Sequence, residues 1–158
     1  MTLGPAKKYG KCKSGQFIPR NPRKYKGDVS QIFYRSGLEL QFMLECDRNP
    51  NIISWVSEEI VIPYLSPVDR KFHRYYPDFL IKVKTTEGVE ESILVEIKPS
   101  SQVQAPTINK RRSKKAMLKE ATTYAINEAK WKYAKEWCDD RNIKFKIITE
   151  KDIGYGKT

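Results

Sequence analysis

Apolar residues recur at helical spacing in two parts of the chain. The first part is residues 36–47, where Ser36 is a suitable N-cap and Asn49-Pro50 follows the last turn. The second part is residues 113–141, where small and aromatic residues recur at steps of three and four and predict one buried face. That predicted face consists of Met117, Ala121, Tyr124, Ala125, Glu128, Trp131, Ala134 and Cys138.

Between and after these helices the pattern changes to the alternation that is typical of strands. Four strands are predicted, over residues 55–64, 72–84, 92–97 and 145–149. Pro77 bends or interrupts the second strand, and because proline cannot donate a ladder hydrogen bond it favours an edge position or a bulge there. The order helix, three strands, helix, strand predicts an α/β protein.

The residues that can do chemistry lie around the second and third strands. Glu96 and Lys98 stand two positions apart at the end of an apolar run, so they face the same way while their apolar neighbours face a core. Turn residues at 85–88 predict a hairpin that brings Asp78 back beside Glu96. Two carboxylates and an ammonium that converge in this way can hold a hard divalent cation next to water and a phosphate.

Glu39 is a further candidate, because it lies in the middle of the apolar stripe of the first helix. An unpaired buried carboxylate is unfavourable, so its position requires a partner. One explanation is a capping box, since Ser36 and Glu39 form the S-x-x-E pattern. The other is a third carboxylate that faces the metal site, and helical geometry alone favours neither.

The net charge of +11 is concentrated in two segments. Residues 1–27 hold eight Lys or Arg and residues 99–119 hold six, without an acid in either, which leaves 16 basic against 19 acidic residues elsewhere. Charge placed in this way predicts binding to the phosphates of a nucleic acid, with an acidic protein partner or a merely solvated surface as alternatives. The predicted DNA contacts are Lys7, Lys8, Lys11, Lys13, Arg20, Arg23, Lys24, Lys110, Arg111, Arg112, Lys114 and Lys115, together with Arg74 on the face of Asp78.

The length of 158 residues predicts one domain over residues 28–158, preceded by a basic arm over residues 1–27 that is extended or mobile. In this arm Phe17 and Tyr25 are expected either to pack on the domain or to stack on bases. His73 is the only histidine, which disfavours histidine-ligated zinc hydrolases and Ser-His-Asp triads, and it is expected on the surface or packed. No apolar run approaches the roughly 20 residues of a membrane span, so no membrane partner is expected.

These motifs resemble the PD-(D/E)XK nuclease superfamily. Within it, the chain resembles the head completion nucleases of T-even-like phages and the TnsA-type endonucleases of transposases over residues 31–153. The residues that carry this resemblance are Tyr34-Arg35-Ser36, Glu39-Leu40, Cys46-Asp47, Asn49-Pro50, Ser54-Trp55, Ser57-Glu58-Glu59, Ile62-Pro63-Tyr64, His73 to Phe79 and Thr149 to Ile153. The resemblance implies a restriction-endonuclease-like αβββαβ core with a small mixed sheet flanked by helices.

The resemblance also implies a role for each site residue. Asp78 and Glu96 would bind Mg²⁺ together with the carbonyl of Ile97, and Mn²⁺ would substitute for it. Lys98 would position or deprotonate the attacking water. Glu39 matches the helix glutamate of the TnsA-type site, which favours a catalytic role and makes it a further candidate ligand.

The implied activity is a metal-dependent endonuclease that hydrolyses double-stranded DNA with little sequence specificity, because backbone contacts do not read bases. The implied setting is phage head completion after DNA packaging, in the cytoplasm of the infected bacterium or on the virion, with portal, neck or capsid proteins as partners. Two alternatives are a capsid or portal accessory protein that binds DNA without cutting it, and a transposase or restriction-type endonuclease. The oligomeric state is left open.

Overall fold

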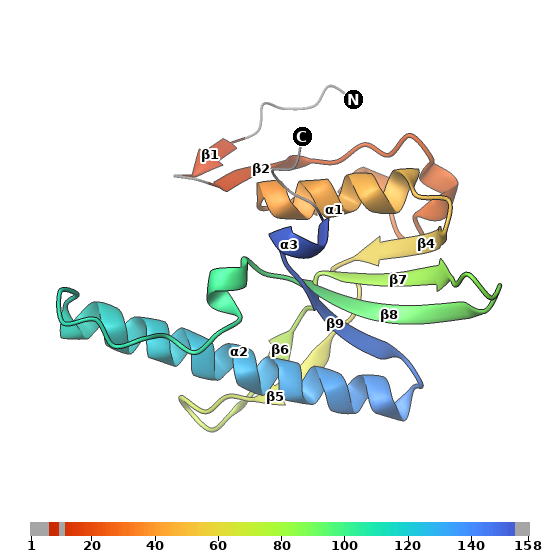
Figure 1. The fold of residues 1–158 in the computed structure, drawn as a ribbon. Coiled ribbons are helices and arrows are strands. Elements are labelled where there is room, and N and C mark those ends of the chain that lie inside the picture. Colours follow the sequence, from red (N-terminus) through yellow and green to blue (C-terminus); the bar gives the residue numbers. More distant parts are fainter. Residues whose placement is uncertain (1–6, 10–11, 154–158) are drawn as a thin grey trace.

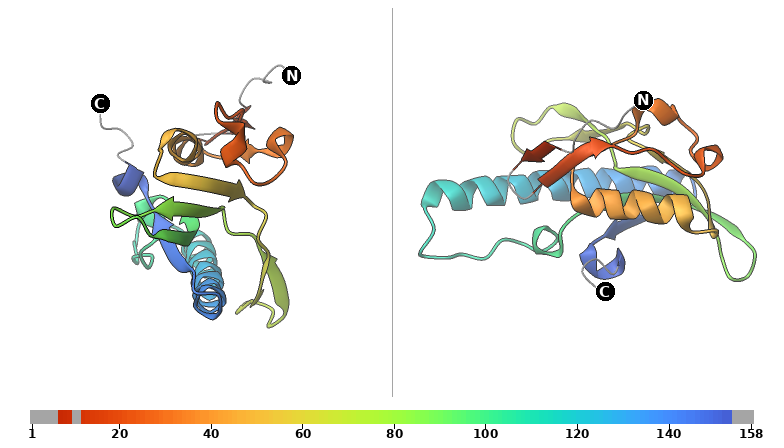
Figure 2. Two further views of the ribbon diagram at one scale, coloured as in Figure 1. Left: turned by 90° about the vertical axis from the view of Figure 1, so that its right-hand side faces the viewer. Right: turned by 90° about the horizontal axis from the view of Figure 1, so that it is seen from above.

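A four-stranded mixed sheet lies between two helices in the computed structural model, which describes residues 7–9 and 12–153 (Figures 1 and 2). The strands follow the order β4-β7-β8-β9, in which the first three are antiparallel and β9 is parallel to β8. Helix α1 covers one face and α2 covers the other (Figure 2). The bounds are α1 Gly37–Arg48, β4 Ile52–Ser57, β7 Phe79–Lys84, β8 Glu90–Ile97, α2 Lys114–Asp140 and β9 Lys144–Ile148. This arrangement confirms the predicted fold class.

Both helices begin where the sequence predicts, because a serine caps each of them. The Ser36 hydroxyl accepts the Glu39 N–H at 3.1 Å, and the Ser113 hydroxyl accepts the Ala116 N–H at 3.1 Å. Each bond satisfies a backbone donor that the first helical turn leaves unpaired.

The face of the sheet toward α1, here called the α1 face, carries an apolar cluster. Met43, Trp55 and Phe79 are buried at 0%, 1% and 1% exposure. The ring of Phe79 lies 4.9 Å from the ring of Phe42 between centroids, and 6.1 Å from that of Trp55. Cys46 of α1 is also fully buried in this cluster. Burial of this much apolar surface is the main source of the stability of this layer.

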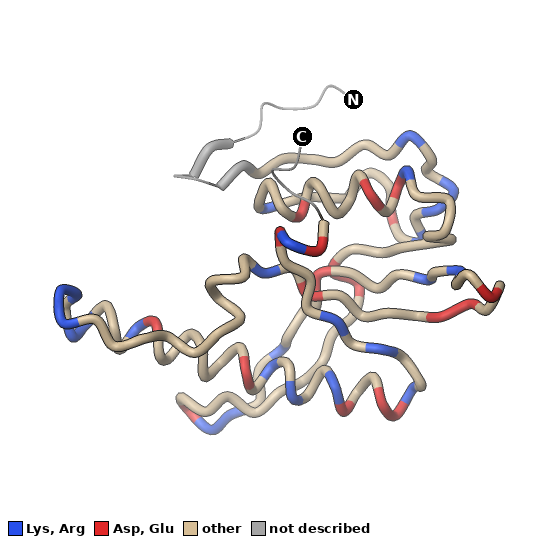
Figure 3. Tube along the Cα trace, viewed as in Figure 1, with Lys and Arg blue, Asp and Glu red and all other residues tan. Residues whose placement is uncertain are grey.

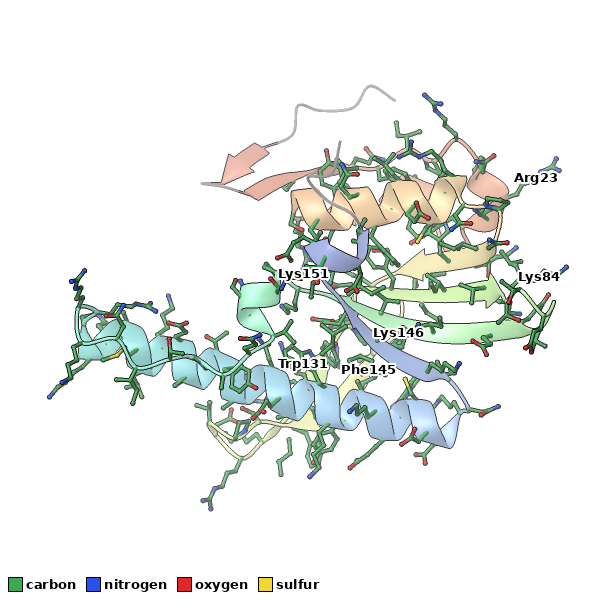
Figure 4. All side chains as sticks on the ribbon, viewed as in Figure 1. Arg23, Lys84, Trp131, Phe145, Lys146 and Lys151 are labelled. Atoms are coloured by element: carbon green, nitrogen blue, oxygen red, sulfur yellow. The ribbon has the colours of Figure 1, made fainter. Side chains whose placement is uncertain are left out.

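The opposite face, here called the α2 face, packs under α2. Leu94 of β8 lies against Ala134 and Cys138 of the helix, all three buried. Trp131 of α2 and Phe145 of β9 line one pocket between these two elements (Figure 4). Strand β8 therefore alternates as predicted: Ile93, Val95 and Ile97 belong to the α1 face, and Leu94 and Glu96 belong to the α2 face.

A separate hairpin corrects the first two predicted strands. The residues predicted as one strand over 55–64 form β4 and then β5 (Ile62–Leu65), and those predicted over 72–84 form β6 (Phe72–Tyr75) and then β7. Strands β5 and β6 pair with each other rather than with the sheet. The chain leaves the sheet at Glu58, whose φ of 54° lies in the left-handed region that ends a strand.

Pro77 lies between β6 and β7, so the predicted interruption is confirmed, but the predicted edge position and bulge are not. Strand β7 is an inner strand, between β4 and β8, and its ladder begins only at Phe79. The proline therefore removes no ladder hydrogen bond. The register irregularity of this part of the sheet is in β4, between Ile52 and Ser54.

The N-terminal segment is packed on the domain over residues 17–25, which corrects the expectation of an extended or mobile arm there. Phe17 and Tyr25 are buried against the ring of Trp55, at centroid distances of 5.8 Å and 4.7 Å. Buried Asp47 accepts the N–H groups of Arg20 and Asn21, each at 2.9 Å. Residues 7–34 contain the strands β1 Lys7–Tyr9, β2 Cys12–Gln16 and β3 Phe33–Tyr34, and the short 3-10 helices Pro22–Lys24 and Val29–Gln31.

Helix α2 is longer than the sheet that it covers. Its 27 residues span about 40 Å, whereas the 8 residues of β8 span about 27 Å. Its buried residues are Asn127, Trp131, Ala134 and Cys138. The predicted buried face is therefore confirmed only at Trp131, Ala134 and Cys138, and Glu128, which was predicted to belong to it, is exposed. The first half extends beyond the sheet beside the loop that follows β8, which contains the 3-10 helix Ser100–Gln102 (Figures 1 and 2).

The chain closes with a short helix, α3 (Glu150–Ile153), which lies beside α1. Neither α1 nor α2, nor any shorter helix among the described residues, combines the length and the apolar character of a membrane span.

Candidate active site

The hairpin of β7 and β8 brings Asp78 and Glu96 together, as the sequence predicts. Phe79 pairs with Val95, so the preceding Asp78 comes opposite Glu96 on the α2 face. The Asp78 carboxylate accepts the Ile97 N–H at 2.7 Å, and the Asp78 carbonyl accepts the Glu58 N–H at 3.0 Å. Two neighbouring strands therefore hold this aspartate in place. The turn forms at 85–88, where Gly88 has a φ of 80° that suits glycine.

Glu96 is buried, at 5% exposure, and is held by a tyrosine. One carboxylate oxygen, Oε2, accepts the hydroxyl of Tyr75 at 2.5 Å. The other, Oε1, lies 3.7 Å from Nζ of Lys98. The side chain is thus fixed through one oxygen, and the second oxygen faces the predicted catalytic lysine.

Lys130 of α2 brings a second ammonium to this site. Its Nζ lies 5.6 Å from the centroid of the Tyr75 ring and 5.7 Å from that of Tyr64, distances at which aromatic faces attract a cation. Burial lowers the pKa of Lys130, while the nearby Glu96 and Asp78 act in the opposite direction. Helix α2 therefore contributes directly to the charge balance around the two carboxylates.

The carboxylates of the site are unfavourable as a bare cluster. Burial, followed by the charges of Glu96 and Glu39, raises the pKa of Asp78 well above its ordinary value. Burial also raises the pKa of Glu96, against the opposing effects of the Tyr75 hydroxyl, Lys98 and Lys130. A bound cation would relieve this repulsion.

A pocket of about 460 Å³ opens above these groups. Arg35 and Glu58 form an ion pair at its wall, with 3.2 Å between Nη1 and Oε1. Arg74 and Tyr76 line the pocket from the β5–β6 hairpin. The full lining is Arg35, Glu58, Arg74, Tyr75, Tyr76, Asp78, Glu96, Lys98 and Lys130.

Glu39 lies near the site but does not line this pocket. Oε2 of Glu39 accepts the backbone N–H of Arg35 at 2.9 Å, and the backbone N–H of Glu39 donates to the Ser36 hydroxyl. This is the predicted capping box, except that the Glu39 carboxylate binds the N–H of Arg35 rather than that of Ser36. Burial, then the charges of Glu58 and Glu96, raise the pKa of Glu39. The carboxylate thus caps α1 within electrostatic reach of the site, and its role as a ligand stays a prediction.

The donor set fits Mg²⁺. Among the residues that the structure describes, no three His, Cys, Asp or Glu side chains form a metal cluster by themselves. Magnesium does not require one, because it is commonly held by one or two carboxylates while water and substrate phosphate complete its shell. Asp78 and Glu96 meet that requirement, with the Ile97 carbonyl as the predicted additional ligand.

The predicted DNA contacts fall into separate regions (Figure 3). Lys110, Arg111, Lys114 and Lys115 are exposed around the start of α2. Arg23 lies at the other end of the molecule (Figure 4), and Arg20 precedes it by three residues. Lys24 has a structural role, because its ammonium donates to the carbonyls of Asp47 and Asn49. Arg112 pairs with Glu120. Lys11 lies outside the described residues, as do the side chains of Lys7, Lys8 and Lys13.

Sequence reasoning assigned no site role to Tyr75, Lys130 or Glu58, although Tyr75 and Glu58 lie in motifs that carry the family resemblance. Strand parity turned Tyr75 away from Asp78, but parity fails here because β6 belongs to the hairpin and the sheet begins only after Pro77. No periodic signal marks Lys130, whose position depends on how α2 crosses the sheet. His73 is exposed, and its Nε2 lies 2.7 Å from Oδ2 of Asp69, as expected of a surface residue.

Comparison with known proteins agrees with this geometry. Residues 49–150 match the family described as TnsA-like endonuclease N terminal, a stretch that contains Asp78, Glu96, Lys98 and Lys130 but not Glu39. The head completion nuclease of Enterobacteria phage T4 is 40% identical over 143 residues, which cover 89% of this chain and 93% of the phage protein. The resemblance seen in the motifs is thereby confirmed, and the chain belongs to the TnsA-like endonuclease family.

Proposed function

We propose that this protein is a Mg²⁺-dependent endonuclease that hydrolyses phosphodiester bonds of double-stranded DNA with little sequence specificity. The observation that carries the proposal is the pair Asp78 and Glu96, held side by side across the β7–β8 hairpin with two lysines beside them. Family membership supports the endonuclease activity.

Each side chain has a task in this reaction. Asp78 and Glu96 would hold the ion, and Tyr75 keeps Glu96 oriented by donating its hydroxyl to Oε2. Lys98, whose ammonium lies beside Oε1 of Glu96, orients the attacking water and donates to a phosphate oxygen. Lys130 adds positive charge to the same pocket, where negative charge increases as water adds to phosphorus. The P–O bond then breaks and leaves one phosphate end and one hydroxyl end.

Mg²⁺ bound there would activate water and neutralise charge on the phosphate, so the chemistry does not require a histidine. Arg35, Arg74, Lys98 and Lys130 line the pocket, and their positive charges suit the phosphates of the DNA backbone, so we expect positioning without sequence selection.

The proposed setting is phage head completion, since the T4 relative carries that name. In this setting the protein would act in the infected bacterium or on the virion, with portal, neck or capsid proteins as partners. A DNA-binding accessory protein that cuts nothing is the competing hypothesis, and the carboxylate–lysine geometry favours the nuclease over it.

The test is cleavage of linear duplex DNA by the purified protein with Mg²⁺, with EDTA, and with Glu96→Gln. Glu91→Gln is the matched control, because it makes the same change on the same strand outside the pocket. We expect cleavage only by the wild type and Glu91→Gln, and only with metal. DNA binding without cleavage in every lane would favour the accessory protein, and cleavage by Glu96→Gln would show that the site is wrong.

A further inference from the structure

Residues 99–126 form a projection that we call the basic finger. It consists of the loop after β8 and the first half of α2, and it extends beyond the sheet in two perpendicular views (Figures 1 and 2). It has little packing of its own, since the buried residues of α2 begin only at Asn127. The core therefore does not explain why the helix is this long.

The charge of the basic finger is almost entirely positive. It holds six Lys or Arg and one acid, Glu120, which pairs with Arg112. The positive residues gather at the far end of α2, where Figure 3 shows them at the tip of the projection. They are Lys110, Arg111, Arg112, Lys114, Lys115 and Lys119. The finger as a whole thus carries a charge that a polyanion would neutralise.

One face of α2 joins this tip to the active site. At 100° per residue, Lys119 and Lys115 lie within about 60° of Lys130 around the helix axis. Lys130 lines the active-site pocket, and the other two lysines are exposed. At 1.5 Å per residue they lie about 16 Å and about 22 Å from Lys130 along the helix. The helix thus carries a row of ammonium groups that begins at the proposed site of cleavage.

The loop of the finger is braced, which keeps this row in place. Ser100 donates its N–H and its hydroxyl to Glu150 of α3, at 2.9 Å and 2.5 Å. The ion pair between Arg112 and Glu120 joins the other end of the loop to the helix. Between these ties the loop runs beside α2 and encloses a pocket of about 500 Å³ with it. Such bracing reduces the entropy lost when an extended surface binds a ligand.

We propose that the basic finger binds the backbone of the DNA on one side of the cleavage site, through Lys119 and Lys115, at about 5 and about 7 base pairs from the scissile phosphate. This inference rests on the proposed function, which makes DNA the ligand and places its reacting phosphate beside Lys130. It adds a requirement: the enzyme needs duplex DNA that extends from the cut along α2.

An acidic protein is the competing partner. Ile108 and Leu118 are exposed on the finger, at 90% and 69%, and exposed apolar side chains suit a protein interface. DNA is favoured because Lys119 and Lys115 continue the face of Lys130 toward the active site, whereas Leu118 lies about 120° away from it around the helix.

The experiment measures binding of labelled duplexes of increasing length in EDTA, where the proposed enzyme does not cut. The double variant Lys115→Gln/Lys119→Gln is compared with wild type and with Lys132→Gln/Lys135→Gln. The latter is the matched control, because it removes the same charge from two exposed lysines on the far side of the same helix.

We expect the finger variant to bind long duplexes about tenfold more weakly, with a salt slope about 1.8 lower for the loss of two phosphate contacts. As the duplex is lengthened, the affinity of the finger variant should reach its plateau at a length about 5 to 7 base pairs shorter than the length at which the wild type does. The control should follow the wild type. Equal affinity, salt slope and length dependence in all three proteins would overturn the proposal. The finger would then be interpreted as a surface that binds an acidic protein.

A parallel cleavage assay with Mg²⁺ separates this inference from the proposed function. Finger-dependent binding without cleavage would contradict the nuclease proposal and support the finger. Cleavage that depends on Glu96 but not on the finger would support the nuclease proposal and contradict the role of the finger.

Discussion

The two faces of the central sheet differ in what they contain, although the same strands build both. The α1 face is apolar along its length, from Trp55 through Phe79 to Val95. The α2 face begins in the same way at Leu94 but ends in Glu96 and Lys98. Because neighbouring residues of a strand face opposite sides, the most buried core and the most polar pocket are one residue apart.

Stability and chemistry are thus assigned to opposite sides of one sheet. On the α1 face burial is favourable and uncompensated charge is absent among the described residues of the cluster. On the α2 face burial acts on carboxylates, and it raises the pKa of both Asp78 and Glu96. The α1 face therefore stabilises a site that would be unfavourable by itself.

The strongest test of the contrast is Asp78→Asn. The amide oxygen can still accept the Ile97 N–H, so the fold is kept while a charged ligand is lost. We expect the cleavage rate to fall by at least about 10³-fold, because charge stabilisation at the reacting phosphate depends on the ligand pair. Single-turnover cleavage measures the rate, and urea denaturation should show no loss of stability.

The complementary change on the α1 face is Met43→Ala. Met43 of α1 is fully buried in the cluster between this helix and the sheet, away from the pocket, and its truncation should lower the free energy of unfolding by about 2–5 kcal/mol. The cleavage rate per folded molecule should stay within about twofold of the wild type. A rate loss comparable to that of Asp78→Asn would show that the two faces are not separate in function.

A smaller effect is expected from Lys130→Met, which removes the second ammonium but keeps much of the side-chain volume. We expect cleavage to slow by about 10- to 100-fold, since one positive group near the phosphate is lost. Lys130→Arg should restore part of the rate, and Lys132→Met is the control on the same helix. Equal rates for both methionine variants would exclude Lys130 from the site.

The smallest expected effect is on stability as a function of pH. In the folded protein the pKa values of Asp78 and Glu96 are raised above the unfolded values of about 3.9 and about 4.3. The native state thus binds more protons in this range, so the free energy of unfolding falls as the pH rises from about 4 through the folded-state pKa values.

The measurement is urea denaturation in EDTA at about pH 5 and about pH 8 for the wild type and Asp78→Asn. The wild type should lose more stability between these values than the variant does. Asp78→Asn removes both the titration of Asp78 and its repulsion of Glu96, so the difference between the two proteins reports this carboxylate pair. A larger loss in the variant would contradict the assigned direction.

The sequence predicted those parts of the molecule that depend on local chemistry. Ser36 and Ser113 begin the helices, and the turn at 85–88 brings Asp78 to Glu96, because caps and turns are specified by a few neighbouring residues. Side-chain alternation then assigned Glu96 and Lys98 to one face.

Features that depend on the path of the chain through space were not predictable. The chain leaves the sheet for the hairpin β5–β6 at Glu58, whose backbone is left-handed. A glutamate does not predict this conformation, because non-glycine residues adopt it rarely. The inward face of the hairpin brings Tyr75 to Glu96, against the parity of a continuous strand. The position of Lys130 and the unburied first half of α2 follow from the length of the sheet relative to the helix.

The two layers also differ in a way that makes their opening separately visible. Each contains one buried thiol, Cys46 on the α1 face and Cys138 on the α2 face. Burial raises the pKa of both thiols, that of Cys138 to about 11, so neither reacts readily with an alkylating reagent until its surroundings open. In a Cys12→Ser background, the alkylation rates of Cys46 and Cys138 would measure separately how often each layer unfolds locally. A nuclease that loosens its catalytic side to admit DNA while its other side stays closed would be recognised by Cys138 reacting ahead of Cys46.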